Sequence, residues 1–306
     1  MKEKILKIDI HAHITAYPDA SPLLPPSRKR MVSEEELLGL YDEVGIEAGV
    51  LLPSVSPEKH DEPFTSGDCQ AASLRHPGRF FWFCGMDPRM FGNKPTTDFS
   101  EPLEHYKALG AKGVGELTAN LPADDPLVDN LFYHCAACDM PVTIHLAPYG
   151  VPYGYYGIQD EVGLPRLEKM LKKHKNLKIL GHSQAFWAEL SDDVTEENRT
   201  GYPRGKVREG WVPELMRRYE NLYCDLSANS GRNAFMRDRE YAARFIEEFP
   251  DRILYGCDVS QSGNDEYVRV FSAWLEDFRA DGMISEENYY KLVRGNAERL
   301  LKLKDD

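Results

Sequence analysis

The stretch Lys7–Ile14, KIDIHAHI, places two histidines at the end of an apolar run rich in isoleucine. Side chains along a strand alternate between its two faces, so His11 and His13 point the same way. Isoleucine is enriched in strands, which favours a first strand over residues 5–14. We therefore expect a strand whose carboxyl end presents two imidazoles in one direction.

Seven further strand-like segments follow, each separated from the next by a helical pattern. They cover residues 48–55, 80–88, 112–120, 141–148, 177–185, 221–229 and 251–260. Ser33 and Glu36 form a predicted capping box at the start of the first helix. Strands that alternate with helices pair in parallel, because each crossover needs a covering helix.

Eight such units predict an α/β fold, a (β/α)₈ TIM barrel that spans residues 1–306 as a single domain. Long loops are expected after the first, fifth and sixth strands. The first covers residues 15–32, and the loop after the sixth strand covers residues 184–210. A doubly wound open sheet is the main alternative, weakened because no GxGxxG motif follows the first strand.

The composition is that of a globular protein without a membrane helix. The chain has 306 residues and a formal net charge of −13, which opposes binding to nucleic acid or to an anionic membrane. No apolar run approaches the length of a membrane span, and the N-terminus lacks a signal-peptide pattern, so we expect a cytoplasmic protein. The six cysteines are too sparse for a disulfide scaffold, and Cys135 and Cys138 are expected to be buried thiols.

Other strand ends carry the same kind of chemistry as the first. His145 ends the fifth predicted strand, His182 the sixth and Asp258 the eighth. A buried carboxylate such as Asp258 needs a partner, and a cation held by imidazoles would supply it. Each residue alone could be an ordinary polar strand end, but that reading is poor for five residues at equivalent positions.

These residues, in this order, resemble the amidohydrolase superfamily, and more narrowly its amidohydrolase-2 branch. The C-terminal stretch RGNAERLL, residues 294–301, also resembles that branch. The resemblance implies that His11, His13, His145 and Asp258 hold a divalent metal, with Asp258 as proton shuttle. It implies that His182 binds a second metal or polarises the substrate. Zn²⁺ is the expected ion, as one or two ions per chain, and Mn²⁺ is the alternative.

The fourth predicted strand offers Glu116, with Lys112 near its start. Many binuclear relatives place a carboxylated lysine or a glutamate there as a bridge between metals, which favours Glu116 as a ligand. The alternative is a carboxylate that only orients a histidine. Asp9 either orients a ligand or forms a buried salt bridge, and Asp225 is either a pocket residue or a structural anchor.

Aromatic and basic residues of the loops predict a wall for a small anionic substrate. The expected contacts come from the loops after the fifth and sixth strands: Tyr153, Tyr156, Trp187 and Arg204. Arg199 belongs to the same group of basic loop residues. The sequence leaves the oligomeric state open, with a homo-oligomer as one alternative.

The leading function is a metal-dependent hydrolase of an ester, lactone or amide. A nonoxidative decarboxylase of an aromatic or unsaturated acid and a non-catalytic metal- or ligand-binding barrel are the alternatives.

Overall fold

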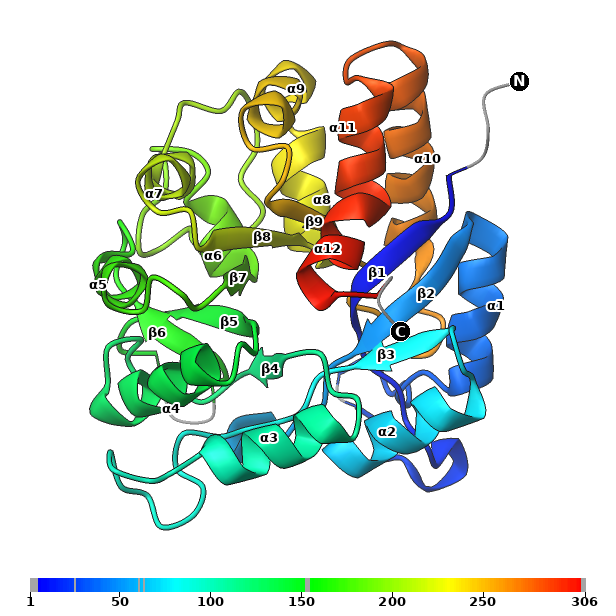
Figure 1. Cartoon of the computed structure of the whole chain (residues 1–306). Coiled ribbons are helices and arrows are strands. Elements are labelled where there is room, and N and C mark those ends of the chain that lie inside the picture. The colour runs from blue at the N-terminus through cyan, green and yellow to red at the C-terminus, as the bar shows by residue number, and fades with distance from the viewer. Residues whose placement is uncertain (1–4, 25, 60, 63, 152–154, 304–306) are drawn as a thin grey trace.

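The computed structural model describes residues 5–24, 26–59, 61–62, 64–151 and 155–303. Eight of its strands lie side by side in parallel around a barrel (Figure 1). In ring order they are β1 (Lys7–Ala12), β2 (Ile46–Leu51), β3 (Phe80–Trp82), β4 (Val114–Leu117), β5 (Val142–Pro148), β7 (Ile179–His182), β8 (Leu222–Leu226) and β9 (Ile253–Tyr255).

Two parallel bridges close the ring. Cys84 pairs with Val114 between β3 and β4, and Ala12 pairs with Val259 between β1 and the segment after β9. The predicted TIM barrel is therefore confirmed, and its strands are the eight that the sequence predicted.

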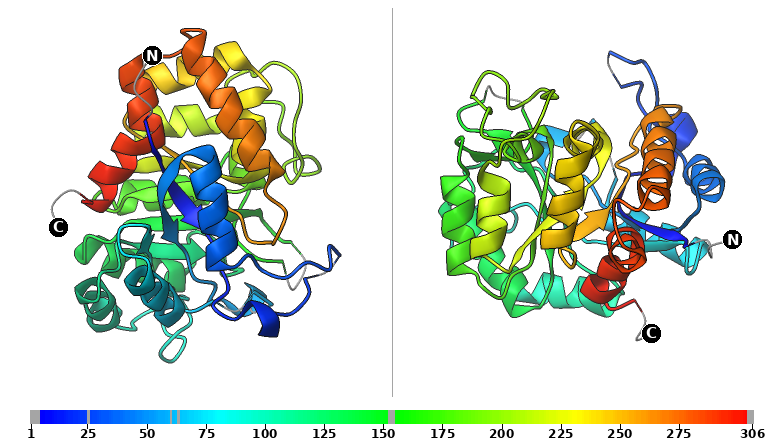
Figure 2. Two further views of the ribbon diagram at one scale, coloured as in Figure 1. Left: turned by 90° about the vertical axis from the view of Figure 1, so that its right-hand side faces the viewer. Right: turned by 90° about the horizontal axis from the view of Figure 1, so that it is seen from above.

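Helices cover the outside of the barrel (Figures 1 and 2). The main ones are α1 (Glu34–Val44), α2 (Ser66–Arg75), α3 (Ser100–Ala108), α4 (Pro126–Ala137), α5 (Pro165–Lys173), α7 (Trp211–Arg218), α9 (Arg239–Glu248) and α10 (Glu266–Ala280). The predicted capping box of α1 is present: the Glu36 backbone N–H donates to the Ser33 hydroxyl, and the Glu36 carboxylate accepts from the Ser33 backbone N–H. Gly45 then ends α1 in the left-handed conformation, at φ 76°.

The amino-terminal end of the barrel is closed by the last helix. The chain ends with α11 (Glu286–Tyr290), a π-helical segment (Lys291–Gly295) and α12 (Asn296–Leu301). Leu300 and Leu301 of α12 belong to one buried cluster with barrel side chains such as Ile8, Val50 and Phe83. Figure 1 shows α12 in front of the strands at this end. The site must therefore open at the opposite, carboxyl end.

The carboxyl end carries elements that sequence periodicity did not reveal. A short strand, β6 (Ile158–Asp160), pairs with the end of β5 inside the predicted loop. Helix α6 (Gln184–Ala188) follows β7, and α8 (Ala228–Met236) follows β8. All three are short or follow directly from a strand, so they offer little periodicity.

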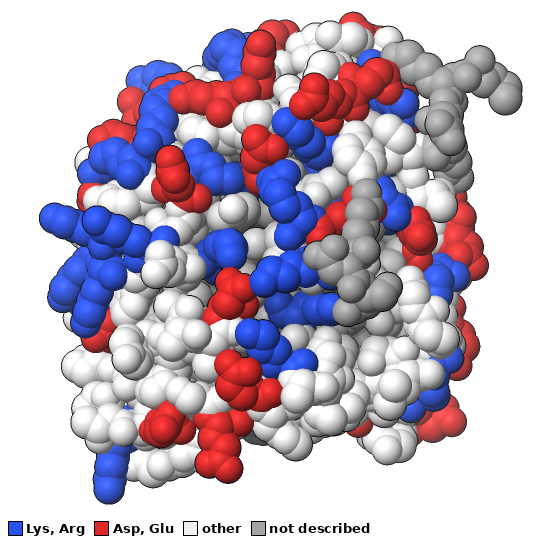
Figure 3. All heavy atoms as spheres, viewed as in Figure 1, with Lys and Arg blue, Asp and Glu red and all other residues white. Residues whose placement is uncertain are grey.

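Charges of both signs are mixed over the face shown in Figure 3, with a group of Lys and Arg at its left edge over α5. All six cysteines are buried and free, as expected. Among the described residues, no helix combines the length and the apolar character needed to cross a bilayer.

Candidate metal centre

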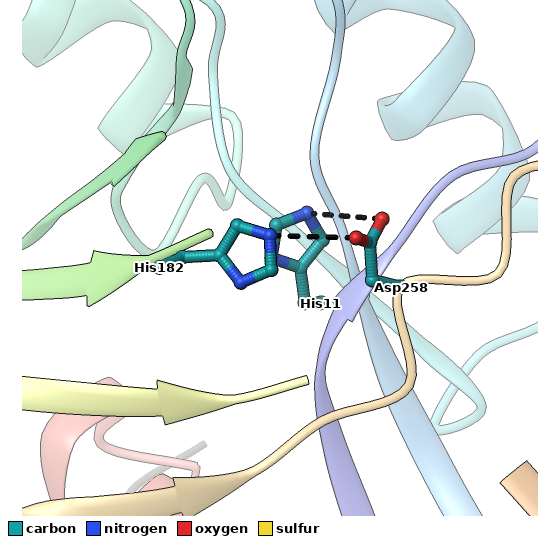
Figure 4. A group of neighbouring side chains, drawn as sticks. All are labelled: His11, His182 and Asp258. Carbon is teal, nitrogen blue, oxygen red and sulfur yellow. Dashed lines mark ion pairs between the residues drawn. The ribbon is translucent and has the colours of Figure 1, made fainter. Parts of the chain in front are cut away.

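Six predicted side chains meet at the carboxyl end of the barrel. They are His11 of β1, His13 directly after β1, Glu116 of β4, His145 of β5, His182 of β7 and Asp258 after β9. Potential ligand atoms lie within 4.8 Å of one another in three groups: His11, His182 and Asp258; His11, His13 and Glu116; and Glu116, His145 and His182. Figure 4 shows His11, His182 and Asp258 turned toward one point from three separate segments.

The histidine pair of β1 is oriented by contacts on the far side of each ring. His11 Nδ1 lies 2.6 Å from Asp225 Oδ2, and His13 Nδ1 lies 2.8 Å from the Leu52 carbonyl oxygen. Both acceptors favour a proton on Nδ1, which leaves Nε2 with a free lone pair. The two Nε2 atoms face each other at 3.0 Å. Two lone pairs at this distance suit a shared cation.

Asp258 lies against three of the histidines. Its carboxylate oxygens are 3.3 Å from His13 Nε2, 3.6 Å from His11 Nε2 and 3.4 Å from His182 Nε2. Ligands about 2.1 Å from a tetrahedral ion stand about 3.4 Å apart, so this spacing fits a divalent cation. The Asp258 side chain is 22 % exposed, whereas each of the other five is at most 10 % exposed. Asp258 is thus the member that water and substrate reach most easily.

The backbone at Asp258 is strained and tied in place. Its φ is 56°, a left-handed conformation that residues other than glycine adopt rarely. The Asp258 N–H donates to the His11 carbonyl at 2.8 Å, and the Tyr267 hydroxyl donates to the Asp258 carbonyl at 2.7 Å. These two bonds aim the carboxylate at the histidines.

Glu116 divides its two oxygens between two histidine groups. Oε1 is 2.7 Å from His145 Nδ1 and 3.9 Å from His182 Nε2. Oε2 is 3.7 Å from His13 Nε2 and 3.8 Å from His11 Nε2. Geometry of this kind is compatible with both roles expected for Glu116, a bridge between cations and a carboxylate that orients His145.

The charges of the centre call for a cation. Burial opposes the charged form of His11, but Asp225 and Asp258 outweigh it and raise the His11 pKa to about 10. Burial alone would raise the pKa of Glu116 and of Asp258, yet the adjacent histidines hold both pKa values below their usual range. The positive charge beside these ionised carboxylates is that of protonated histidine, and a divalent cation bound to neutral imidazoles would supply it in place of the proton.

Two buried aspartates support the β1 histidines from behind. Asp225 of β8 is fully buried and contacts the His11 ring, so it acts as an anchor and not as a pocket wall. Asp9 accepts from the backbone N–H groups of His11 and Cys257 and from the Tyr41 hydroxyl. Burial raises the Asp9 pKa to about 6. Asp9 therefore fixes the backbone of the ligand strand through hydrogen bonds.

A polar cavity of about 230 Å³ opens over the centre. Of the predicted substrate contacts, Tyr156 lines it, and Tyr153 lies outside the described residues. Trp187 requires a correction: it is 2 % exposed, and its indole N–H donates to the Asp225 carbonyl at 3.0 Å. Trp187 lies in the five-residue helix α6, which turns its side chain into the protein. The sequence analysis placed this segment in a loop and so did not predict that direction.

The two arginines predicted to bind the substrate, Arg199 and Arg204, are not among the described residues that line this cavity. Arg204 is exposed in its loop and does not line the cavity. Arg199 is fully buried, where its guanidinium donates to the Asp160 carbonyl at 2.8 Å and lies 3.2 Å from Glu189. It ties the long loop after β7 to β6.

Several residues at the cavity escaped the sequence reasoning, among them Lys59, Glu62 and Tyr267. Lys59 and Glu62, from the loop after β2, form an ion pair at 2.7 Å in the cavity wall. Tyr267 of α10 lines the cavity and holds Asp258. Lys59 and Glu62 lie in an ordinary polar stretch without periodicity, so no signal marks them. The YVRVF pattern of α10 predicts a helix but does not say that Tyr267 faces the site.

A family model described as "Amidohydrolase" matches residues 8–303. No curated protein matches the sequence. The solved structures of similar fold include an uncharacterized TIM-barrel protein from Bordetella bronchiseptica, with 19% identity, a TM-score of 0.64 and coverage of 97% of this chain and 98% of the other.

Two further structures of similar fold carry names of enzymes. A putative 2-pyrone-4,6-dicarboxylic acid hydrolase from Pseudomonas putida has 15% identity, a TM-score of 0.61 and coverage of 99% and 100%. A dihydroxybenzoic acid decarboxylase from Polaromonas sp. JS666, solved with bound manganese and 2-nitroresorcinol, has 19% identity, a TM-score of 0.61 and coverage of 99% and 98%. At these identities the likeness concerns the fold, whereas the family model covers nearly the whole sequence. The chain belongs to the amidohydrolase family of metal-dependent enzymes.

Proposed function

We propose that the protein is a hydrolase that uses two divalent cations to cleave a C–O or C–N bond of an ester, lactone or amide. The observation that carries this proposal is the position of Glu116. Its Oε2 lies 3.7 and 3.8 Å from the two β1 imidazoles, and its Oε1 lies 2.7 Å from His145. A carboxylate that reaches two histidine pairs is suited to bridge two ions.

The residues divide into two ligand sets that share Glu116. His11, His13 and Asp258 would hold one cation with Glu116, and His145 and His182 would hold the other. Imidazole and carboxylate ligands suit Zn²⁺ first and Mn²⁺ as the alternative. When bound, such a cation lowers the pKa of water and polarises a carbonyl group.

Asp258 is the residue proposed to move the proton. Its carboxylate is ionised and exposed to the cavity, and the Tyr267 hydroxyl holds the Asp258 backbone carbonyl, so the carboxylate can accept a proton from the attacking water. The water oxygen bonds to the carbonyl carbon, and the bond from that carbon to the leaving oxygen or nitrogen breaks. Asp258 then returns the proton to the leaving group. If only one cation binds and His182 does not hold it, the His182 ring, 3.4 Å from Asp258, would polarise the substrate carbonyl instead.

A decarboxylase is the second candidate. His11, His182 and Asp258 lie close enough to hold one cation without Glu116, and the decarboxylase relatives that the sequence resembles are usually mononuclear. Such a lyase would protonate the substrate carbon and release carbon dioxide, with no water consumed. A non-catalytic barrel is the third reading, and the intact ligand sets disfavour it.

The test compares both reactions on one preparation. Protein refilled with Zn²⁺, and separately with Mn²⁺, is incubated with a panel of lactones, esters, amides and hydroxybenzoic acids. Acid release and carbon dioxide release are followed in parallel. We expect acid release that depends on added metal. Carbon dioxide release without acid release establishes the decarboxylase instead, and retained metal without turnover of any compound contradicts both enzymes.

A further inference from the structure

One of the four imidazoles of the metal centre has a different kind of partner behind its ring. The other three place Nδ1 at 2.6, 2.8 and 2.7 Å from an oxygen that only accepts: His11 from Asp225, His13 from the Leu52 carbonyl, and His145 from Glu116. Such an acceptor keeps the proton of a neutral ring on Nδ1 and the lone pair on Nε2. His182 is the exception, because its Nδ1 lies 3.0 Å from Ser227 Oγ, and a hydroxyl both donates and accepts.

Ser227 stands where a serine normally caps a helix. It precedes α8 in the extended conformation of an N-cap residue, with φ −97° and ψ 176°, yet within the described chain its side chain accepts no hydrogen bond from the α8 backbone. Ser33, at the same position before α1, accepts from the Glu36 N–H at 3.3 Å. A side-chain cap stabilises a helix. The Ser227 hydroxyl forgoes that contribution and is directed at His182 instead.

Close packing against the backbone after β9 confines the Ser227 side chain. Ser227 and Asp225 are both fully buried. A Cβ added at Gly256 would lie 2.7 Å from Ser227 Cβ and 3.0 Å from Asp225 Oδ1. The first distance is shorter than real Cβ contacts, so any side chain at Gly256 would displace Ser227. The glycine therefore makes room for both side chains behind the metal centre.

Asp225 determines the direction of the hydrogen bond between Ser227 and His182. Its Oδ2 lies 3.7 Å from His182 Nδ1. A buried carboxylate at this distance favours a proton on Nδ1, so the ring donates and the hydroxyl oxygen accepts. Nε2 of His182 then keeps its lone pair. That atom lies 3.4 Å from Asp258 Oδ2 and 3.9 Å from Glu116 Oε1, among the other candidate ligand atoms.

We propose that Ser227 is a positioning residue of the metal centre: with Asp225 behind the ring, it holds the proton on His182 Nδ1, so that Nε2 is presented to a cation. This inference rests on the proposed function only for the second cation, which His145 and His182 would hold. The tautomer is a separate property, because it applies to a centre with one ion or with two. The opposite tautomer, with the proton on Nε2, is the one that would polarise a substrate carbonyl.

The test reads the tautomer of His182 by ¹⁵N NMR of the Zn²⁺-loaded protein labelled at histidine. The His182 signals are identified by their loss in His182→Gln. We expect a protonated Nδ1 and an unprotonated Nε2 in the wild type. Ser227→Ala should speed the exchange of the Nδ1 proton with water. It should also lower the affinity for a bound Zn²⁺ about tenfold, the low end of the range for loss of a group that orients a metal-binding histidine, because Asp225 remains.

Ser33→Ala is the matched control, because it removes an N-cap hydroxyl that is bonded to a helix backbone and not to a histidine. It should lower the melting temperature and leave zinc affinity and the His182 signals unchanged. A proton on His182 Nε2, or an affinity of Ser227→Ala for every bound Zn²⁺ within twofold of the wild type, overturns the inference. The expected tautomer with a single Zn²⁺ per wild-type chain supports the inference and contradicts the two-cation hydrolase.

Discussion

Asp225→Asn tests whether the buried carboxylate behind His11 sets the affinity for metal. Asp225 Oδ2 lies 2.6 Å from His11 Nδ1, and both side chains are fully buried. The asparagine keeps the size of the side chain but loses the charge, and its amide can turn an N–H toward the imidazole. His11 then presents a less basic Nε2 in a less fixed orientation.

The magnitude follows from this contact. Loss of a carboxylate that orients a metal-binding histidine lowers metal affinity about 10- to 100-fold, which corresponds to about 1.4 to 2.8 kcal/mol. We expect the upper end of this range, because no solvent reaches the pair to replace the lost interaction.

Zinc affinity is measured by competition with a chromophoric chelator at fixed pH. Glu34→Gln is the matched control, since Glu34 Oε2 lies 2.9 Å from His76 Nε2 in another carboxylate–histidine pair that is not part of the metal centre. The control should bind zinc like the wild type. An Asp225→Asn affinity within twofold of wild type would refute the role given to Asp225.

Three further changes separate catalysis, stability and pH response. Tyr267→Phe should lower kcat about tenfold, the cost of one lost hydrogen bond to Asp258, with metal content and KM unchanged; a fall in metal content contradicts this. Leu301→Ala should lower the free energy of unfolding by about 2 to 5 kcal/mol in urea titrations, because α12 plugs the barrel, and should leave zinc affinity unchanged. Burial raises the pKa of Asp160 from 3.8 to about 7, so the unfolded chain ionises first and stability falls as pH rises between these values. Asp160→Asn should show a weaker fall between pH 5 and 7.5, and equal slopes would contradict the assignment.

Much of the barrel follows from local patterns in the sequence. The eight barrel strands and the α1 capping box could be predicted because alternation and capping act over a few residues. The convergence of His145, His182 and Asp258 could be predicted because parallel strands end at the same rim. That parallel strands end at the same rim can be inferred from the order of the strands along the chain, without knowledge of their three-dimensional contacts.

The substrate wall could not be predicted in the same way. Trp187 follows a strand end, but the short helix α6 turns it into the protein, where it bonds to Asp225. Arg199 carries a charge in a long loop, yet it is buried against Glu189. Lys59 comes from a polar loop after β2 and reaches the cavity. The direction of a loop side chain depends on contacts distant in sequence, which neither composition nor spacing records.

The metal content of the Glu116→Gln variant tests the central claim most directly. Wild-type and variant proteins are loaded with Zn²⁺, freed of excess ion and analysed for metal per chain. A bridging carboxylate shared by two ions predicts two Zn²⁺ per wild-type chain and a fall toward one in Glu116→Gln. Two ions retained in the variant, or a single ion in the wild type, would contradict the two-cation centre.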